Sequence, residues 1–305
     1  MARTDDDTWD TSTGVGMTAT FGAVARAIAS NKGLLNDPFA EPLVRAAGVD
    51  HFSRVVDDNR YATDPGEDRL LSGLIEVLAA HTRFSDEFLT GAVAAGINQV
   101  VILASGLDTR PYRLWWPPGT TLYEVDQPEV LDFKTAVLRG LGAKLRSNRC
   151  AVGMDLRQDW LAALRRVGFD AQQPTVWVAE GLLVGYLPPD EQNRLLRDVT
   201  AVSAAGSRFA ADHISTWTPS HIQGGRAFVD GWRQQGLDVD LGALMYSGEY
   251  RDVPAFLAEQ GWQTVERTVA EMFNVTGLAR RWRGSAEDVA VTPRYVTAGR
   301  PRGRM

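Results

Sequence analysis

The sequence predicts an α/β fold in which a seven-stranded, mostly parallel sheet follows an N-terminal helical extension, and three observations support this prediction. Residues 100–104 form an uninterrupted apolar run rich in β-branched side chains, which is typical of a strand buried on both faces of a parallel sheet. After Gly106, strand patterns alternate with helix patterns, as they do in βαβ units. Before Gln99 no strand pattern occurs.

The composition limits the classes of protein to which this chain can belong. Its 305 residues can bury a large core, and 44% hydrophobic with 23% charged residues is ordinary for a globular protein. A formal net charge of −6 provides no broad basic surface, which disfavours a nucleic-acid partner. Neither a membrane-spanning run nor a cationic signal peptide is apparent.

Cysteine and histidine usage points to a protein of the cytoplasm without a metal centre. Cys150 is the single cysteine, so an internal disulfide is excluded. Four scattered histidines and one cysteine show no metal-ligand spacing. We therefore expect a cytoplasmic location, no membrane contact and no metal.

The first 95 residues are predicted to form a mobile arm followed by a helical extension that could cover a site. Helices are expected over residues 15–30, 37–48 and 68–94. In the last of these, Gly73 or Ser85 is expected to break or kink the apolar stripe.

Residues 96–305 are predicted to form the sheet domain. Strands are expected over residues 100–104, 120–125, 149–154, 175–179, 207–213, 262–269 and 289–298. Helices are expected over residues 127–141 and 159–167 and from the Pro188-Pro189 pair onward. We interpret residues 215–250, which are rich in aromatic side chains and glycine, as a helical insertion with loops.

Three predicted strands end in acidic residues, and the first strand ends at a glycine. Gly106 lets the chain turn sharply and lets a ligand approach the backbone. Asp126, about twenty residues further on, is suited to accept hydrogen bonds from both ribose hydroxyls, or alternatively to cap the next helix. Asp155 and Leu156 offer an acceptor and an N–H for an adenine edge, although a helix cap is an equal alternative for Asp155. Glu180 could hold a ligand ammonium or begin a helix.

These strand ends favour a nucleoside ligand that lacks phosphates. The window from Ala104 to Thr109 does not match GxGxxG, and no GxxxxGK[ST] loop occurs, so pyrophosphate recognition is disfavoured. S-adenosylmethionine fits the acidic residues and an arginine better. A nicotinamide-dependent oxidoreductase and a non-enzymatic nucleoside-binding protein remain alternatives.

Several longer motifs resemble the S-adenosylmethionine-dependent methyltransferases related to leucine carboxyl methyltransferase. The matching segments read NDPFAEPLV, HTRFSDEFL, ASGLDTRPYRL, YEVDQPEVLDFK, MDL and AEGLLVGYLPPDE. The chain looks closest to the large bacterial branch whose members are described as O-methyltransferases. This resemblance implies a Rossmann-like class I methyltransferase domain with a last strand that runs antiparallel, and S-adenosylmethionine as cofactor.

The resemblance also implies the positions of the cofactor site. It assigns the ribose to Asp126, the adenine to Asp155 and Leu156, and close packing against the cofactor to Gly106. It assigns the methionine carboxylate to Arg83 and the methionine end to Glu180. For Asp108, Thr109 and Arg110, local turn contacts and ligand contacts remain equally open.

The methyl acceptor is expected to be a small molecule, with either of two chemistries. A carboxylate acceptor is ionised at neutral pH and needs no general base. A hydroxyl acceptor would need one, and the candidates are His213, His221 and Tyr186. The resemblance favours the carboxylate, and the sequence assigns no catalytic residue.

Overall fold

The computed structural model describes residues 10–12, 16–58, 69–215, 230, 245–246, 248–278 and 293–302, and only the backbone of residues 69–72. Its strands are β1 Gln99–Leu103, β2 Thr121–Asp126, β3 Asn148–Gly153, β4 Thr175–Leu183, β5 Arg208–His213, β6 Gln263–Arg267 and β7 Arg294–Gly299. Its helices are α1 Gly16–Asn31, α2 Ala40–Ala46, α3 Asp50–Asp57, α5 Arg69–Ala94, α6 Arg110–Arg113, α7 Pro128–Gly140, α8 Trp160–Arg166, α9 Pro189–Ala201, α12 Val253–Glu259 and α13 Val269–Val275.

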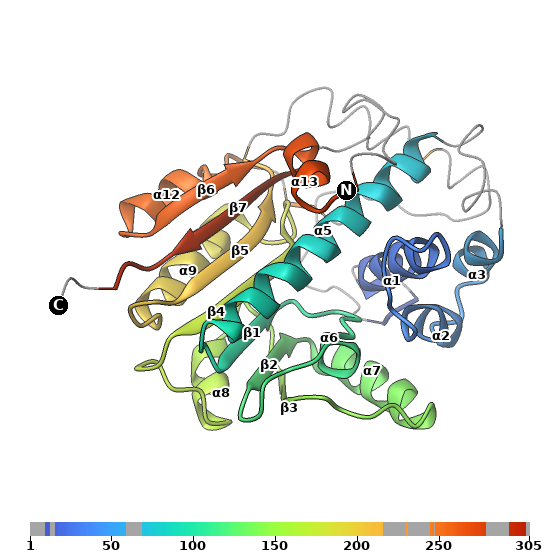
Figure 1. Ribbon diagram of the computed structural model, residues 1–305, viewed down its shortest axis with the longest axis horizontal. Helices are drawn as coiled ribbons and strands as arrows, with labels where there is room; N and C mark the ends of the chain where they lie inside the picture. The colour runs from blue at the N-terminus through green and yellow to red at the C-terminus, as the bar shows by residue number, and fades with distance from the viewer. Residues whose placement is uncertain are drawn as a thin grey trace.

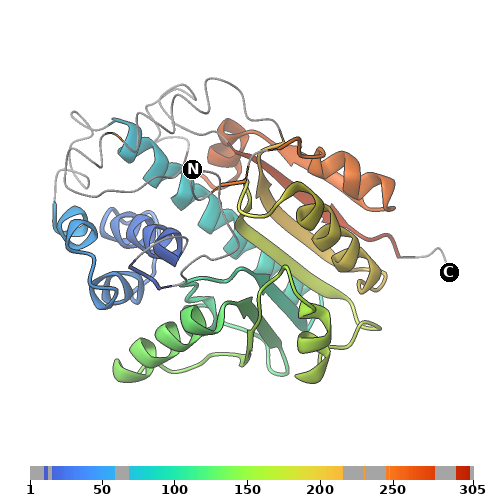
Figure 2. The same cartoon turned by 180° about the vertical axis from the view of Figure 1, so that it is seen from behind.

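The strands form one seven-stranded sheet in the order β3-β2-β1-β4-β5-β7-β6. β1 to β5 run parallel, and β7 pairs antiparallel with both β5 and β6. This arrangement confirms the predicted Rossmann-like, mostly parallel sheet with an antiparallel last strand. Helices cover both faces, with α5 across one face and α8, α9 and α12 on the other (Figures 1 and 2).

The two faces of β1 explain why its sequence is apolar without alternation. Val100 and Ile102 pack with side chains of α5 such as Leu89 on one face. Val101 and Leu103 pack into the opposite core cluster, which includes Trp160 of α8 and side chains of α9. Because successive side chains of a strand point to opposite faces, a strand covered on both must be apolar at every position.

The helices α1, α2 and α3 lie together beside the sheet (Figure 1). α1 packs against α2, α3 and α5, and the buried side chains between them form a second apolar cluster. α5 is a single helix of 26 residues, so neither Gly73 nor Ser85 breaks it. α3 was not expected from the sequence; it buries Phe52, Val55 and Val56.

The strand predicted over residues 262–269 is shorter in the structure than expected. β6 ends at Arg267, and the residues after it form α13 because Thr268 and Glu271 make a capping box. The insertion predicted over residues 215–250 lies mostly outside the described residues, and so does His221. Of its described residues, Tyr250 donates a hydrogen bond from its hydroxyl to the Leu187 carbonyl, 2.8 Å away.

A buried ion cluster lies between β2, β3 and α7. Lys134 and Glu124 are fully buried and their charged atoms are 2.8 Å apart, while Arg149 contacts the other carboxylate oxygen of Glu124. Lys134 Nζ also lies 3.5 Å from the Ser105 hydroxyl. Removing one member of such a cluster leaves a charge buried without its partner, which is strongly destabilising.

Replacing Lys134 by methionine should therefore lower the free energy of unfolding by about 3 kcal/mol. The control is Arg45→Ala, because Arg45 pairs with Glu41 and Asp57 at the exposed surface and such pairs contribute little. Urea unfolding of both variants measures the difference. Equal losses in the two variants would contradict the assigned role of the buried cluster.

Candidate functional site

The register of the parallel strands brings their carboxyl ends to one edge of the sheet. Leu103 of β1 is paired with Val125 of β2 and with Ala179 of β4. Ala179 is in turn paired with Ala211 of β5. The residues that follow each strand therefore lie next to one another, which is where open α/β sheets bind their ligands.

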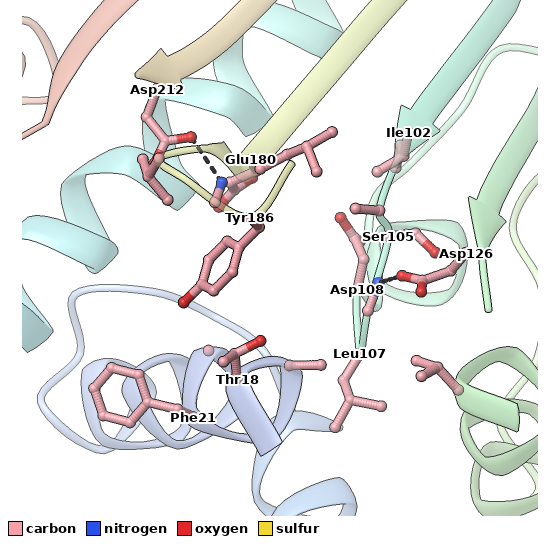
Figure 3. A pocket seen from close by; sticks show the side chains of 18 of the residues that line it. Thr18, Phe21, Ile102, Ser105, Leu107, Asp108, Asp126, Glu180, Tyr186 and Asp212 are labelled. Atoms are coloured by element: carbon pink, nitrogen blue, oxygen red, sulfur yellow. Dashed lines mark hydrogen bonds between the residues drawn. The ribbon is translucent and has the colours of Figure 1, made fainter. Parts of the chain in front are cut away.

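The turn after β1 is held by Asp126, at the end of β2. The Gly106 N–H donates to Asp126 Oδ2 at 2.5 Å, and the Gln127 N–H donates to Oδ1 at 2.7 Å (Figure 3). Burial raises the pKa of Asp126 above its usual value, and the two N–H donors oppose this without cancelling it. These two hydrogen bonds fix the orientation of the Asp126 carboxylate beside the turn.

The same turn is left-handed and tightly packed. Ala104 has φ of 49° and Gly106 has φ of 47°. A non-glycine residue in this region carries a conformational cost of roughly 1–2 kcal/mol, and such strain occurs most often at functional sites. A Cβ on Gly106 would lie 3.1 Å from the Ala19 Cβ, so a larger residue there would press against α1 where it crosses the turn.

The end of β3 supplies a second carboxylate. Asp155 accepts hydrogen bonds from the Arg157 guanidinium, at distances from 2.7 to 3.1 Å, and a hydrogen bond from the Gln127 side chain. Burial alone would raise the pKa of Asp155, but the bonds from Arg157 outweigh burial and lower it. Leu156 follows as a buried residue.

Glu180, at the irregular end of β4, belongs to a cluster built around a buried arginine. The Arg110 guanidinium lies 2.7 Å from Glu180, 2.6 Å from Asp108 and 2.6 Å from Asp86. Burial raises the pKa of Glu180, but Arg110, together with smaller contributions from His81 and Arg26, outweighs burial and lowers this pKa to about 2. Asp108 and Arg110 therefore make turn and ion-pair contacts with each other.

Asp212, at the end of β5, completes the row of strand-end carboxylates. Its Oδ1 accepts the Gly181 N–H at 2.7 Å, and its Oδ2 lies 3.8 Å from His81 Nδ1 (Figure 3). Burial raises the pKa of Asp212, and neither His81 nor the Gly181 N–H fully offsets this. The sequence prediction missed Asp212, although the strand-end rule that found Asp126 and Glu180 also applies to it.

These groups line one cavity of about 360 Å³. Asp126 and Ser105 lie at one side of it and Glu180 and Asp212 at the other, with Tyr186 and Phe21 below (Figure 3). The remaining lining is largely apolar and comes from α1, α3, α5, the residues after β4 and β5, and the described end of the insertion. It includes Phe52, Leu74, Leu78, Val184, Leu187, Ile214 and Met245.

Five of the six cofactor residues expected from the sequence line this cavity. They are Gly106, Asp126, Asp155, Leu156 and Glu180. Arg83 does not line it: its side chain is 44% exposed on α5 and lies 3.3 Å from Glu87. Its neighbours His81 and Thr82 face the cavity instead.

The base candidates expected from the sequence fall in different places. Tyr186 lines the cavity. His213 does not; its ring lies 3.2 Å from Glu266 and 3.1 Å from the Ser215 hydroxyl, because it alternates with Asp212 along β5.

Two general features are absent from the part of the chain that the structure describes. No group of three or more His, Cys, Asp or Glu side chains there could hold a metal ion. No helix among those residues is long and apolar enough to cross a membrane.

Comparisons with known proteins agree with the geometry. A profile of the family described as "Leucine carboxyl methyltransferase" matches residues 18–200. A protein of Mycobacterium avium (strain 104) named "Putative S-adenosyl-L-methionine-dependent methyltransferase" is 61% identical, over 94% of this chain and 98% of its own length. A protein of the same name from Mycobacterium marinum is 46% identical, over 98% of this chain and 99% of its own. A solved structure from Thermobifida fusca, titled as a putative methyltransferase, is 19% identical with a TM-score of 0.48, covering 94% of this chain and 98% of that one.

The pKa of Glu180 predicts a pH-dependent cost for its replacement. In the folded chain this pKa is about 2 against an ordinary value of 4.5, so its charged form stabilises the fold above pH 4.5 and loses that effect as the pH falls towards 2. The loss of unfolding free energy in Glu180→Gln should therefore be largest near pH 7 and shrink below pH 4.5. Chemical unfolding at several pH values measures it, and a loss independent of pH would refute the ion-pair assignment.

Proposed function

This chain belongs to the leucine carboxyl methyltransferase family, and from that premise we propose that it is an O-methyltransferase acting on a small molecule. Its cofactor is S-adenosylmethionine. The proposed acceptor oxygen belongs to a carboxylate or a hydroxyl, and the methyl group passes to it directly, in line with the bond that breaks. Membership of this family removes the nicotinamide-dependent oxidoreductase as a competing function.

The observation that carries the proposal is one cavity with strand-end carboxylates at both ends, which would receive the nucleoside and the methionine portions of the cofactor. At the nucleoside end, Asp126 is fixed by two backbone N–H groups, so its free lone pairs are available to two ribose hydroxyls. Gly106 adopts the left-handed conformation of the turn and leaves room for Ala19 of α1, so the turn can line the cavity. Asp155 and Leu156 would receive the adenine.

At the methionine end, Glu180 would hold the cofactor ammonium. Its carboxylate stays ionised because Arg110 lowers its pKa. The carboxylates of the cavity therefore fit a ligand with ribose hydroxyls at one end and an ammonium at the other. The apolar side chains beyond this end would receive the acceptor.

The chain's contribution to the reaction is positioning and the exclusion of water. When bound, the cofactor supplies an electrophilic methyl carbon on a sulfonium, so the protein need only hold the acceptor oxygen about 3 Å away and in line. The apolar lining from α1 and α5 keeps water from the site. A cytoplasmic location and a division near residue 95 into a helical extension and a sheet domain stay predictions.

Replacing Asp126 by alanine should weaken the binding of S-adenosylhomocysteine by more than about tenfold, because charge-assisted hydrogen bonds to ribose contribute roughly 1.5–3 kcal/mol. Calorimetry measures the affinity. The control is Asp159→Ala, which removes an exposed carboxylate that only caps α8. Unchanged affinity in a folded Asp126→Ala protein would rule out the ribose assignment.

Arg83 is tested by its conservative replacement. The family resemblance assigns it the cofactor carboxylate, whereas its exposed position beside Glu87 predicts that Arg83→Lys leaves affinity within about twofold of the wild type. S-adenosylhomocysteine and adenosine should be titrated in parallel. A loss for S-adenosylhomocysteine alone would restore the assignment from the resemblance, because adenosine lacks the carboxylate and a lysine cannot reproduce the two-pronged guanidinium contact.

A further inference from the structure

Two carboxylates, Glu180 and Asp212, lie at the end of the cavity assigned to the methionine portion of the cofactor. The cofactor assignment uses Glu180 and leaves Asp212 without a role. Glu180 is engaged by Arg110 and, at 3.2 Å, by the Thr82 hydroxyl. Asp212 has one oxygen on the Gly181 N–H, and its other oxygen faces the imidazole of His81. Both Asp212 and His81 are buried, with 5% and 3% of their surface exposed, and both line the cavity.

The cations around the cavity are already paired with carboxylates. Among the residues that the structure describes, four arginines line the cavity. The pairs are Arg26–Asp37, Arg110–Asp108, Arg113–Asp86 and Arg157–Asp155. A carboxylate acceptor brought to this end would meet Asp212 as a like charge at low dielectric, which is unfavourable. A hydroxyl acceptor would instead bring a proton, which the neighbouring imidazole of His81 can accept.

His81 is placed to take that proton. It projects from α5, and its ring packs edge-on against Tyr295 of β7 with ring centroids 4.8 Å apart, which restricts its rotation. Its Nδ1 faces Asp212 Oδ2 at 3.8 Å, longer than a hydrogen bond but typical of catalytic contacts that tighten when ligands bind. An Nδ1–H directed at Asp212 would leave the Nε2 lone pair to accept a proton.

We propose that the acceptor is a hydroxyl compound, that His81 is its general base, and that Asp212 is the positioning residue that fixes the His81 tautomer. This inference rests on the proposed O-methyltransferase function and names the substrate class of that same site. The hydroxyl proton passes to His81 Nε2 while the acceptor oxygen forms its bond to the methyl carbon. The bond between that carbon and sulfur breaks with its electron pair left on sulfur, and the proton on His81 returns to solvent. The products are a methyl ether and S-adenosylhomocysteine.

The first test reads the His81 tautomer by ¹⁵N NMR of the full chain with S-adenosylhomocysteine bound. Neutral His81 should carry its proton on Nδ1 in the wild type, and Asp212→Asn should shift the population towards Nε2–H. The control is Glu266→Gln, which changes the partner of His213 and should leave the His81 signals in place. A wild-type proton on Nε2, or a tautomer indifferent to Asp212→Asn, overturns the proposal whether or not an acceptor is known.

The second test offers two probe acceptors on one ring system, 4-phenylphenol and biphenyl-4-carboxylic acid, with radiolabelled S-adenosylmethionine. A base-stable methyl ether is expected, and His81→Gln and Asp212→Asn should each lower its rate of formation by about 100-fold or more. His213→Gln, next along β5 but outside the cavity, should retain the wild-type rate. A base-labile methyl ester as the main product would overturn the inference while supporting the proposed methyl transfer to oxygen.

A third measurement, of ligand affinity, tests whether His81 and Asp212 act in catalysis or in cofactor binding. S-adenosylhomocysteine and 5′-methylthioadenosine, which lacks the amino-acid portion, should bind His81→Gln and Asp212→Asn within about twofold of the wild type. A loss confined to S-adenosylhomocysteine would make either residue a cofactor ligand and refute its catalytic assignment. A wild-type protein that bound neither compound would instead contradict the proposed function itself.

Discussion

The site depends on the ion pairs that the buried Arg110 guanidinium makes with three carboxylates. This guanidinium joins Asp86 of α5, Asp108 of the turn after β1 and Glu180 at the end of β4, three segments far apart in the sequence. A buried charge that loses its partners costs several kcal/mol, so these segments are stable only when they meet. The fold therefore builds the Glu180 end of the cavity as a condition of folding, and α5, which precedes the sheet in the chain, lines the same cavity.

Sequence reasoning located the sheet well because its strands are recognisable locally. β1 and β4 begin as apolar, β-branched runs, and each of β1 to β5 was predicted within four residues of its bounds. α3 was missed because Phe52, Val55 and Val56 provide only two turns of helical periodicity. The strand predicted to reach Val269 was too long because valine and threonine favour strands, whereas the capping box at Thr268 begins a helix there.

The candidate site was predictable where it follows strand ends and not where it depends on helix rotation. Asp126, Asp155 and Glu180 could be found because parallel strands end at one edge of a sheet. Arg83 and His81 stand two residues apart on α5, which places them on different sides of the helix. The surrounding residues do not reveal which side faces the sheet, since Tyr295, which packs on His81, comes more than 200 residues later.

The placement of β7 between β5 and β6 has a consequence for how the chain is made. β6 has β7 as its neighbour in the sheet, and β5 carries β7 along the edge opposite β4. During synthesis at the ribosome, β1 to β5 can associate early, but β5 keeps an open edge and β6 has no partner until residues 294–299 emerge. The strand that bears Asp212 is thus enclosed last, and a nascent chain halted before β7 would expose two unpaired strand edges to other chains.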